Sequence, residues 1–222
     1  MVVTGIALPP AIAGLGRAQL VRDFRTSIHS TRVAKIIAAL GTSLGLARDE
    51  VTEIAVASAM HDVGKFAIPI EILHKRDRLS RDEVTLIKSH AEVGHRILLT
   101  PGDRMSELAA LIALCHHERF DGSGYPHGLA GGAIPLPAQI ASICDIYDAL
   151  REERPYRPSL SHEVAMSIIL VGDGRTKPSH FAPRVLTAFC SLSEEIRQVF
   201  DDAYQITSPF ANGAFLAAAG MA

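Results

Sequence analysis

The chain has 222 residues, of which 48% are hydrophobic and 21% are charged, and its formal net charge is −2. At about 100–200 residues per domain, this length predicts one domain with a sizeable core, and the composition excludes a wholly disordered chain. A weakly acidic chain without a block of lysine or arginine is not expected to bind nucleic acid or an anionic membrane surface.

In the first half of the chain, the sequence predicts an irregular N-terminal lead-in segment followed by two helices. Residues 1–16 are uncharged and irregular, too short to span a bilayer and without the basic start of a secretory signal. Apolar residues then recur at helical spacing over residues 18–44. A second helix is expected over 49–61, stopped by Gly64, and 66–80 reads as a connector.

The remainder of the chain predicts five more helices around one long loop. Ser80 and Glu83 form a capping-box pattern at the start of the first of them. The expected helices are 80–99, 104–117, 137–150, 161–171 and 183–203. The glycine-rich stretch 121–132 is a long loop, a feature that is usually functional in a compact domain. No strand pattern is present, so we expect an all-α fold: a single compact bundle of about seven helices over residues 17–203, with a C-terminal tail at 204–222.

Histidines and aspartates interrupt apolar helical runs at regular intervals. The candidate residues are His29, His61, Asp62, His90, His116, His117 and Asp145, separated by 32, 1, 28, 26, 1 and 28 residues. A helical hairpin has about that length, so each hairpin would bring one residue or one doublet to a common point. A single histidine of this kind is more often an ordinary core residue. The combination predicts a metal site between helices, because a buried charge is costly unless it is paired or metal-bound.

The donor set also indicates which ions are expected. Five imidazoles and two carboxylates suit iron or manganese, with zinc as a further candidate. Seven ligands are too many for one ion, so we expect two divalent ions bridged by Asp62. Such a pair would leave coordination positions open, as in catalytic sites, and could activate a shared water and clamp a phosphodiester.

Several motifs together resemble the HD-GYP family, a branch of the HD metal-dependent phosphohydrolases. They are HDVGK (61–65), His90 with Gly94, HHERFDGSGYPHGL (116–129), DIYDAL (145–150), RPY (154–156) and, more loosely, SHFAPRVLTAF (179–189). The resemblance implies the seven ligands named above. It also implies hydrolysis of cyclic di-GMP to pGpG, often onward to GMP, by a metal-bridging hydroxide.

By this resemblance the catalytic residues are Asp62 and Lys65, and Lys65 would hold or polarise the substrate phosphate. Lys65 could instead be a cation favoured by the end of a helix. Arg154, Arg157 and Lys177 are the nearest candidates to neutralise a second phosphate, although each could be a solvated surface charge.

The GYP loop, which is the glycine-rich stretch 121–132, would border the substrate pocket through Gly124 and Tyr125. It is also a candidate surface for a protein partner. Tyr125 could instead pack beneath the loop, and the glycines could simply permit positive φ. Glu118 is either an acceptor that orients a ligand imidazole or an ordinary helix-end carboxylate.

Two positions depart from the family pattern. Some members hold a third metal through a glutamate four residues before the first histidine, where this chain has Arg25. A cation cannot be a ligand, so we expect two metals and not three. Ala182 stands where many relatives have an acid, and we expect only a structural effect there.

Two other functions stay open: an HD-type hydrolase of another cyclic dinucleotide or nucleotide, and a nucleotide-sensing or protein-interaction module with little turnover. Cys115, Cys144 and Cys190 are scattered and odd in number, which argues against a disulfide framework and predicts buried, inert thiols. We expect a cytoplasmic protein without a membrane segment. The oligomeric state is not readable from the sequence.

Overall fold

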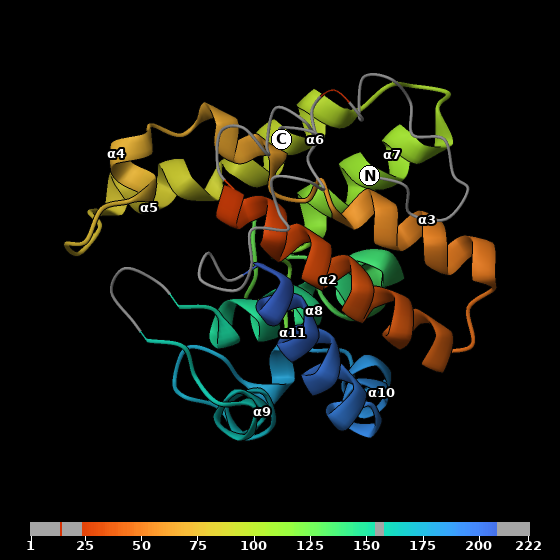
Figure 1. The fold of residues 1–222 in the computed structure, drawn as a ribbon. Coiled ribbons are helices and arrows are strands. Elements are labelled where there is room, and N and C mark those ends of the chain that lie inside the picture. The colour runs from red at the N-terminus through yellow and green to blue at the C-terminus, as the bar shows by residue number, and fades with distance from the viewer. Residues whose placement is uncertain (1–13, 15–23, 154–157, 208–222) are drawn as a thin grey trace, which may run out of the picture.

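A computed structural model describes residue 14, residues 24–153 and residues 158–207, which form the helical bundle shown in Figure 1. The α-helices are α2 (Phe24–Ser43), α3 (Arg48–Ser58), α4 (Ile70–Leu73), α5 (Arg81–Lys88), α6 (His90–Leu98), α7 (Arg104–Cys115), α8 (Leu136–Arg151), α9 (His162–Leu170), α10 (Pro183–Ser191) and α11 (Ser193–Thr207). Three 3₁₀ segments are η1 (Val63–Ala67), η2 (Gly131–Ala133) and η3 (Pro178–His180). These described ranges contain no strand, only an isolated bridge between Asp121 and Ala130. The predicted all-α fold is confirmed.

The bundle has more helices than the seven or so predicted, because two expected helices are each interrupted. The helix expected over 80–99 breaks at Ser89, whose hydroxyl donates to the Leu86 carbonyl at 2.7 Å. Such bonds to the preceding turn bend helices. The helix expected over 183–203 breaks at Leu192, where φ is −99° and ψ is 12°. The connector 66–80 also contains the short helix α4.

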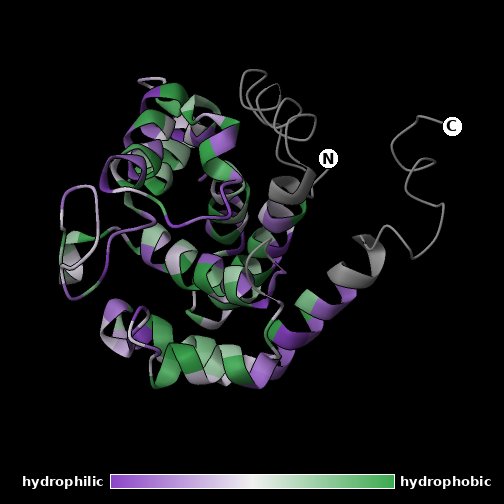
Figure 2. Ribbon diagram, turned by 90° about the vertical axis from the view of Figure 1, so that its left-hand side faces the viewer, coloured by the Kyte–Doolittle hydropathy of each residue, from purple (hydrophilic) through white to green (hydrophobic). Residues whose placement is uncertain are grey.

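Helix α2 lies at the centre of the bundle and packs against α3, α8, α10 and α11 (Figure 1). Its side chains Ile36, Ile37 and Leu40 are fully buried, at the helical spacing that the sequence predicted. In Figure 2, apolar and polar residues alternate along the helices, as expected where each helix buries one side. This packing carries His29, which lies earlier on α2, into the interior.

Gly64 has a different role from the predicted one. Helix α3 already ends at Ser58, and Gly64 lies within η1. A Cβ atom on Gly64 would stand 1.9 Å from the carbonyl oxygen of His90 and 2.6 Å from the amide nitrogen of Gly94. Only glycine allows η1 to lie this close to α6. The contact brings the chain next to Asp62 against the start of α6.

The predicted domain limits at 17 and 203 stay predictions. Nearly all of the lead-in 1–16 lies outside the described residues, and α11 continues past the predicted end to Thr207. Within the described ranges, no helix combines the length and the apolar character needed to cross a membrane.

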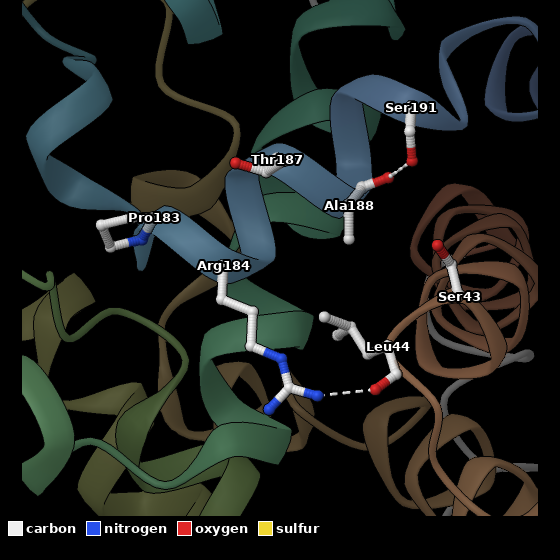
Figure 3. Close-up of a pocket in the computed structure, with 7 residues that line it drawn as sticks. All are labelled: Ser43, Leu44, Pro183, Arg184, Thr187, Ala188 and Ser191. Carbon is white, nitrogen blue, oxygen red and sulfur yellow. Dashed lines mark hydrogen bonds between the residues drawn. The ribbon is translucent and has the colours of Figure 1, made fainter.

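A pocket of about 500 Å³ lies between the end of α2 and α10 (Figure 3). It is lined by Ser43, Leu44, Pro183, Arg184, Thr187, Ala188 and Ser191. Arg184 donates to the Leu44 carbonyl at 2.7 Å across it. None of the predicted site residues lines this pocket.

Candidate metal centre

The seven predicted ligands meet in the interior of the bundle. His29 is on α2, His61 and Asp62 lie between α3 and η1, His90 begins α6, His116 and His117 follow α7, and Asp145 is on α8. Five of them are buried, and His117 and Asp145 are partly exposed. Distant parts of the chain thus place nitrogen and oxygen donors side by side.

Three of the imidazoles are oriented in the same way, by the main-chain carbonyl three residues before each ring. The pairs are His61 with Ser58 at 2.7 Å, His90 with Ile87 at 2.6 Å, and His116 with Ala113 at 2.9 Å. A carbonyl oxygen only accepts, so each ring donates from Nδ1. The Nε2 atoms are thereby left to face the centre of the cluster.

The facing Nε2 atoms show that the cluster fits a cation. His90 and His116 place these atoms 3.3 Å apart. Burial lowers the pKa of both rings, so both are neutral and carry their single proton on Nδ1. Two lone pairs at this distance repel each other unless a positive ion lies against both. Imidazole and carboxylate donors together suit a divalent transition metal.

Asp62 joins two groups of donors through its two carboxylate oxygens. Oδ2 lies 3.4 Å from Nε2 of His61, whereas Oδ1 lies 3.4 Å from Nε2 of His90 and 3.9 Å from that of His116. We call the two groups the Asp145 side (His29, His61, Asp62, Asp145) and the His90 side (Asp62, His90, His116, His117). The donor atoms of Asp62, His90, His116 and His117, and separately those of His29, His61 and Asp62, lie close enough together to hold one ion. Asp145 adjoins the second group, with Oδ1 3.1 Å from Nε2 of His29 and 3.7 Å from Nε2 of His61.

On the Asp145 side, His29 lies between two carboxylates. Its Nε2 atom is 3.1 Å from Oδ1 of Asp145, and its Nδ1 donates to Oδ2 of Asp148 at 2.7 Å. Burial lowers the pKa of His29, but the hydrogen bonds to Asp145 and Asp148 outweigh burial and raise it to about 10. The Nε2 position of His29 is therefore strongly attractive to a positive charge.

Asp62 remains ionised although it is buried. Burial raises its pKa, but the charges of Lys65 and His61 outweigh burial and hold the pKa well below its usual range. Lys65 donates to Oδ2 of Asp62 from one helical turn further along η1. An anionic carboxylate between two groups of donors is what a bridging ligand requires.

Comparison with known proteins identifies the family. A sequence model described as the HD domain matches residues 18–177, most of the chain.

The chain belongs to the HD domain family.

Relatives of this HD domain carry names that confirm the resemblance drawn from the motifs. It is 38% identical over 188 residues to the cyclic di-GMP phosphodiesterase response regulator RpfG of Xanthomonas campestris pv. campestris, covering 85% of this chain and 49% of that protein. It is also 38% identical over 175 residues to the 3'3'-cGAMP-specific phosphodiesterase 2 of Vibrio cholerae serotype O1, covering 79% of this chain and 33% of that protein. The chain therefore spans about half, or less, of these curated relatives.

A solved structure supports the fold alone. The HD domain of the L. monocytogenes phosphodiesterase PgpH has a TM-score of 0.60 at 19% identity, covering 86% of this chain and 98% of that chain. Such a likeness confirms the helical HD fold seen here.

The GYP loop of the HD domain packs against the His90 side. The ring of Tyr125 stacks on His117, with centroids 4.6 Å apart and 26° between the planes. Lys88 covers the ring of Tyr125, with Nζ 4.9 Å from its centroid. Burial raises the pKa of Tyr125. A Cβ atom on Gly124 would stand 2.4 Å from the amide nitrogen of Arg119, so glycine is required where the loop returns to the histidine doublet.

Glu118 has neither of the two roles considered for it from the sequence. It is buried, and its carboxylate oxygens accept from the main-chain amides of His127 at 2.7 Å and Leu129 at 2.9 Å. Glu118 therefore ties the far end of the GYP loop to the residues that follow α7.

Sequence reasoning missed the two residues that support His29. Asp148 is fully buried and accepts from Arg32 as well as from His29. A signal was present, because Arg32 follows His29 and Asp148 follows Asp145 by three residues, on the same faces of their helices.

Some of the remaining predicted residues fall in parts of the chain that the structure does not describe. Arg154 and Arg157 lie outside the described residues, as does the side chain of Arg25. Lys177 is exposed at the start of η3, and its role stays a prediction. Ala182 is buried and precedes α10.

The cysteine thiols agree only in part with the prediction. Cys115 and Cys144 are buried, and burial raises the pKa of both, that of Cys115 to about 11. Cys190 is partly exposed, so the expectation of a buried thiol is wrong there. It packs from α10 against the hydrophobic core without being fully covered.

Proposed function

We propose that this chain is a metal-dependent phosphodiesterase that hydrolyses a cyclic dinucleotide, with cyclic di-GMP as the first candidate. The observation that carries the proposal is the pair of donor groups that share the ionised carboxylate of Asp62. The name of the Xanthomonas relative, a cyclic di-GMP phosphodiesterase, supports the choice of substrate.

The proposed cofactor is a pair of divalent cations, one on each side of Asp62. The mixture of imidazole and carboxylate donors favours iron or manganese, with zinc as a further candidate. Arg25 replaces the glutamate that holds a third metal in some HD-GYP proteins, so two ions per chain are expected.

Cations bound there would act as Lewis acids toward a phosphodiester and lower the pKa of water. The residues of the chain divide the remaining tasks. The imidazoles hold their Nε2 atoms toward the centre through fixed Nδ1 hydrogen bonds. Lys65 keeps Asp62 anionic and would stabilise the charge that develops on the phosphate. Tyr125 would form a wall beside the substrate, and Arg154, Arg157 and Lys177 are the candidates to neutralise the second phosphate.

The test is anaerobic purification with metal analysis, followed by product analysis on cyclic di-GMP. We expect close to two ions per chain and the products pGpG, GMP or both. Asp62→Ala should lose turnover together with bound metal. Metal-replete protein that turns over no cyclic dinucleotide would contradict the proposal, as would an Asp62→Ala variant with unchanged turnover.

A second substrate has specific support. The Vibrio relative, named a 3'3'-cGAMP-specific phosphodiesterase, is as similar in identity as the Xanthomonas protein. A panel of cyclic di-GMP, 3'3'-cGAMP and cyclic di-AMP would separate these substrates. Single-turnover kinetics on the same panel would separate an enzyme from a sensor that binds but hardly turns over.

The cellular location of the protein and its partners are also proposals. We propose a cytoplasmic location, as expected from the sequence. A protein partner at the GYP loop remains a proposal that a pull-down with loop variants would test. The oligomeric state requires a solution measurement.

A further inference from the structure

His29 is held differently from the other oriented imidazoles. His61, His90 and His116 donate from Nδ1 to main-chain carbonyls. His29 instead donates from Nδ1 to the carboxylate of Asp148, at 2.7 Å. A carboxylate partner fixes the tautomer and orientation of a ligand imidazole and makes the ring a more basic ligand.

Asp148 is itself held in a single position. Its side chain is fully buried, and a guanidinium fork from Arg32 reaches both of its oxygens, Nε to Oδ1 at 2.6 Å and Nη2 to Oδ2 at 2.7 Å. Two parallel bonds of this kind fix geometry as well as charge. Asp148 can therefore present Oδ2 to His29 without an unpaired charge in the core.

Residues at the end of α8 and on α11 fix Arg32 in turn. Arg32 is buried, donates to Glu152 at 3.3 Å, and lies 4.8 Å from the centroid of the Phe200 ring on α11. Phe200 on α11, Arg32 on α2 and Asp148 on α8 thus form a chain of contacts that ends at the imidazole of His29.

We infer that Asp148 is a positioning residue for one cation position only, that of the Asp145 side. This inference rests on the proposed function. The hydrogen bonds of Asp148 within the described residues reach His29 and Arg32, and His29 belongs to the Asp145 side. On the His90 side, main-chain carbonyls orient His90 and His116, and none of the hydrogen bonds of Asp148 within the described residues reaches this side.

The experiment is a titration of metal-free protein with Mn²⁺, monitored by a spectroscopic signal that resolves the two binding steps. Wild type, Asp148→Asn, His29→Ala and the double variant form a thermodynamic cycle. Glu152→Gln is the matched control, because it removes a carboxylate beside Arg32 and leaves Asp148 in place. Chemical unfolding of each metal-free variant reports on the fold separately.

We expect Asp148→Asn to weaken one binding step by about 10–100-fold, the usual effect of losing such a partner, and to leave the other step unchanged. The double variant should bind Mn²⁺ with the same affinities as His29→Ala, because Asp148 acts through His29. Glu152→Gln should retain both steps.

The inference alone would be overturned if Asp148→Asn kept both binding steps as in wild type, or if it weakened both steps equally and lost the metal-free fold. Additive effects in the cycle would also contradict it. A wild-type chain that binds no Mn²⁺ and no other divalent cation would overturn the proposed function as well, so the two failures are distinguishable.

Discussion

Gly64→Ala should separate the two sides of the candidate metal centre. The added Cβ would stand 1.9 Å from the carbonyl oxygen of His90, and real contacts of this kind are not shorter than 3.0 Å, so η1 must move from α6 by at least 1.1 Å. The obstacle is backbone, which cannot rotate away. Asp62 lies two residues before Gly64 and is 3.4 Å from Nε2 of His90, so this movement is a large fraction of the distance between two ligands.

Overpacking of a close backbone contact costs about 1–3 kcal/mol of unfolding free energy. A displacement of about 1 Å in a catalytic group can cost on the order of 100-fold in rate. We therefore expect Gly64→Ala to fold with a lower denaturation midpoint, to bind Mn²⁺ more weakly and to lose most of its turnover.

Gly132→Ala is the matched control, because a Cβ atom there meets nothing within 4 Å. Denaturant titration, metal titration and turnover should be measured for both variants. The reasoning is refuted if Gly64→Ala matches Gly132→Ala in all three measurements.

Three further predictions follow from the electrostatics and the loop contacts. Burial, the largest cause, lowers the pKa of His117 to about 3, so the unfolded chain takes up a proton near pH 6.5 that the folded metal-free chain does not. The unfolding free energy of metal-free protein should fall as pH decreases from about 6.5 toward 3. The unfolding free energy of the His117→Asn variant should fall less steeply, as denaturant titrations of both proteins at pH 7 and pH 5 would measure. Lys65→Met should lower turnover by about 10²–10³-fold, as does loss of other groups that stabilise transition-state charge; a matching loss of bound metal would show that Lys65 acts only through its carboxylate partner. Glu118→Gln should speed hydrogen exchange at the amides of His127 and Leu129 by about 10–100-fold, since bonds to a charged group contribute about 1.5–3 kcal/mol; unchanged protection would mean that the loop is held by other contacts.

The helical spacing of apolar residues was sufficient to predict the all-α fold and the helices on which, or just after which, the candidate ligands lie. The interruption at Ser89 was not predictable, because it depends on a side chain that bonds to its own preceding turn. Gly64 was read as a helix stop, because a one-dimensional pattern contains no information on how closely η1 approaches α6.

The candidate ligands were visible as polar residues in apolar runs, but the residues that orient them were not. Arg32 and Asp148 are 116 positions apart, and each taken alone resembles a surface charge on an amphipathic helix. Glu118 likewise finds its partners in a loop whose path no periodicity describes.

The main-chain carbonyls that accept hydrogen bonds from the rings of His61, His90 and His116 belong to Ser58, Ile87 and Ala113. All three lie in the final turns of α3, α5 and α7, where the regular helical pattern of donors ends. The carbonyl of Ser58 also accepts from the amide of His61 at 3.1 Å, and that of Ile87 from the amide of Ser89. Each ring therefore gives a hydrogen bond to the C-terminal end of a helix and also turns its Nε2 atom toward the centre of the candidate metal site. Exchange of such a histidine for alanine removes one hydrogen bond from a helix end, so its damage extends beyond lost ions. Asparagine or glutamine is therefore the fairer replacement in any dissection of the site.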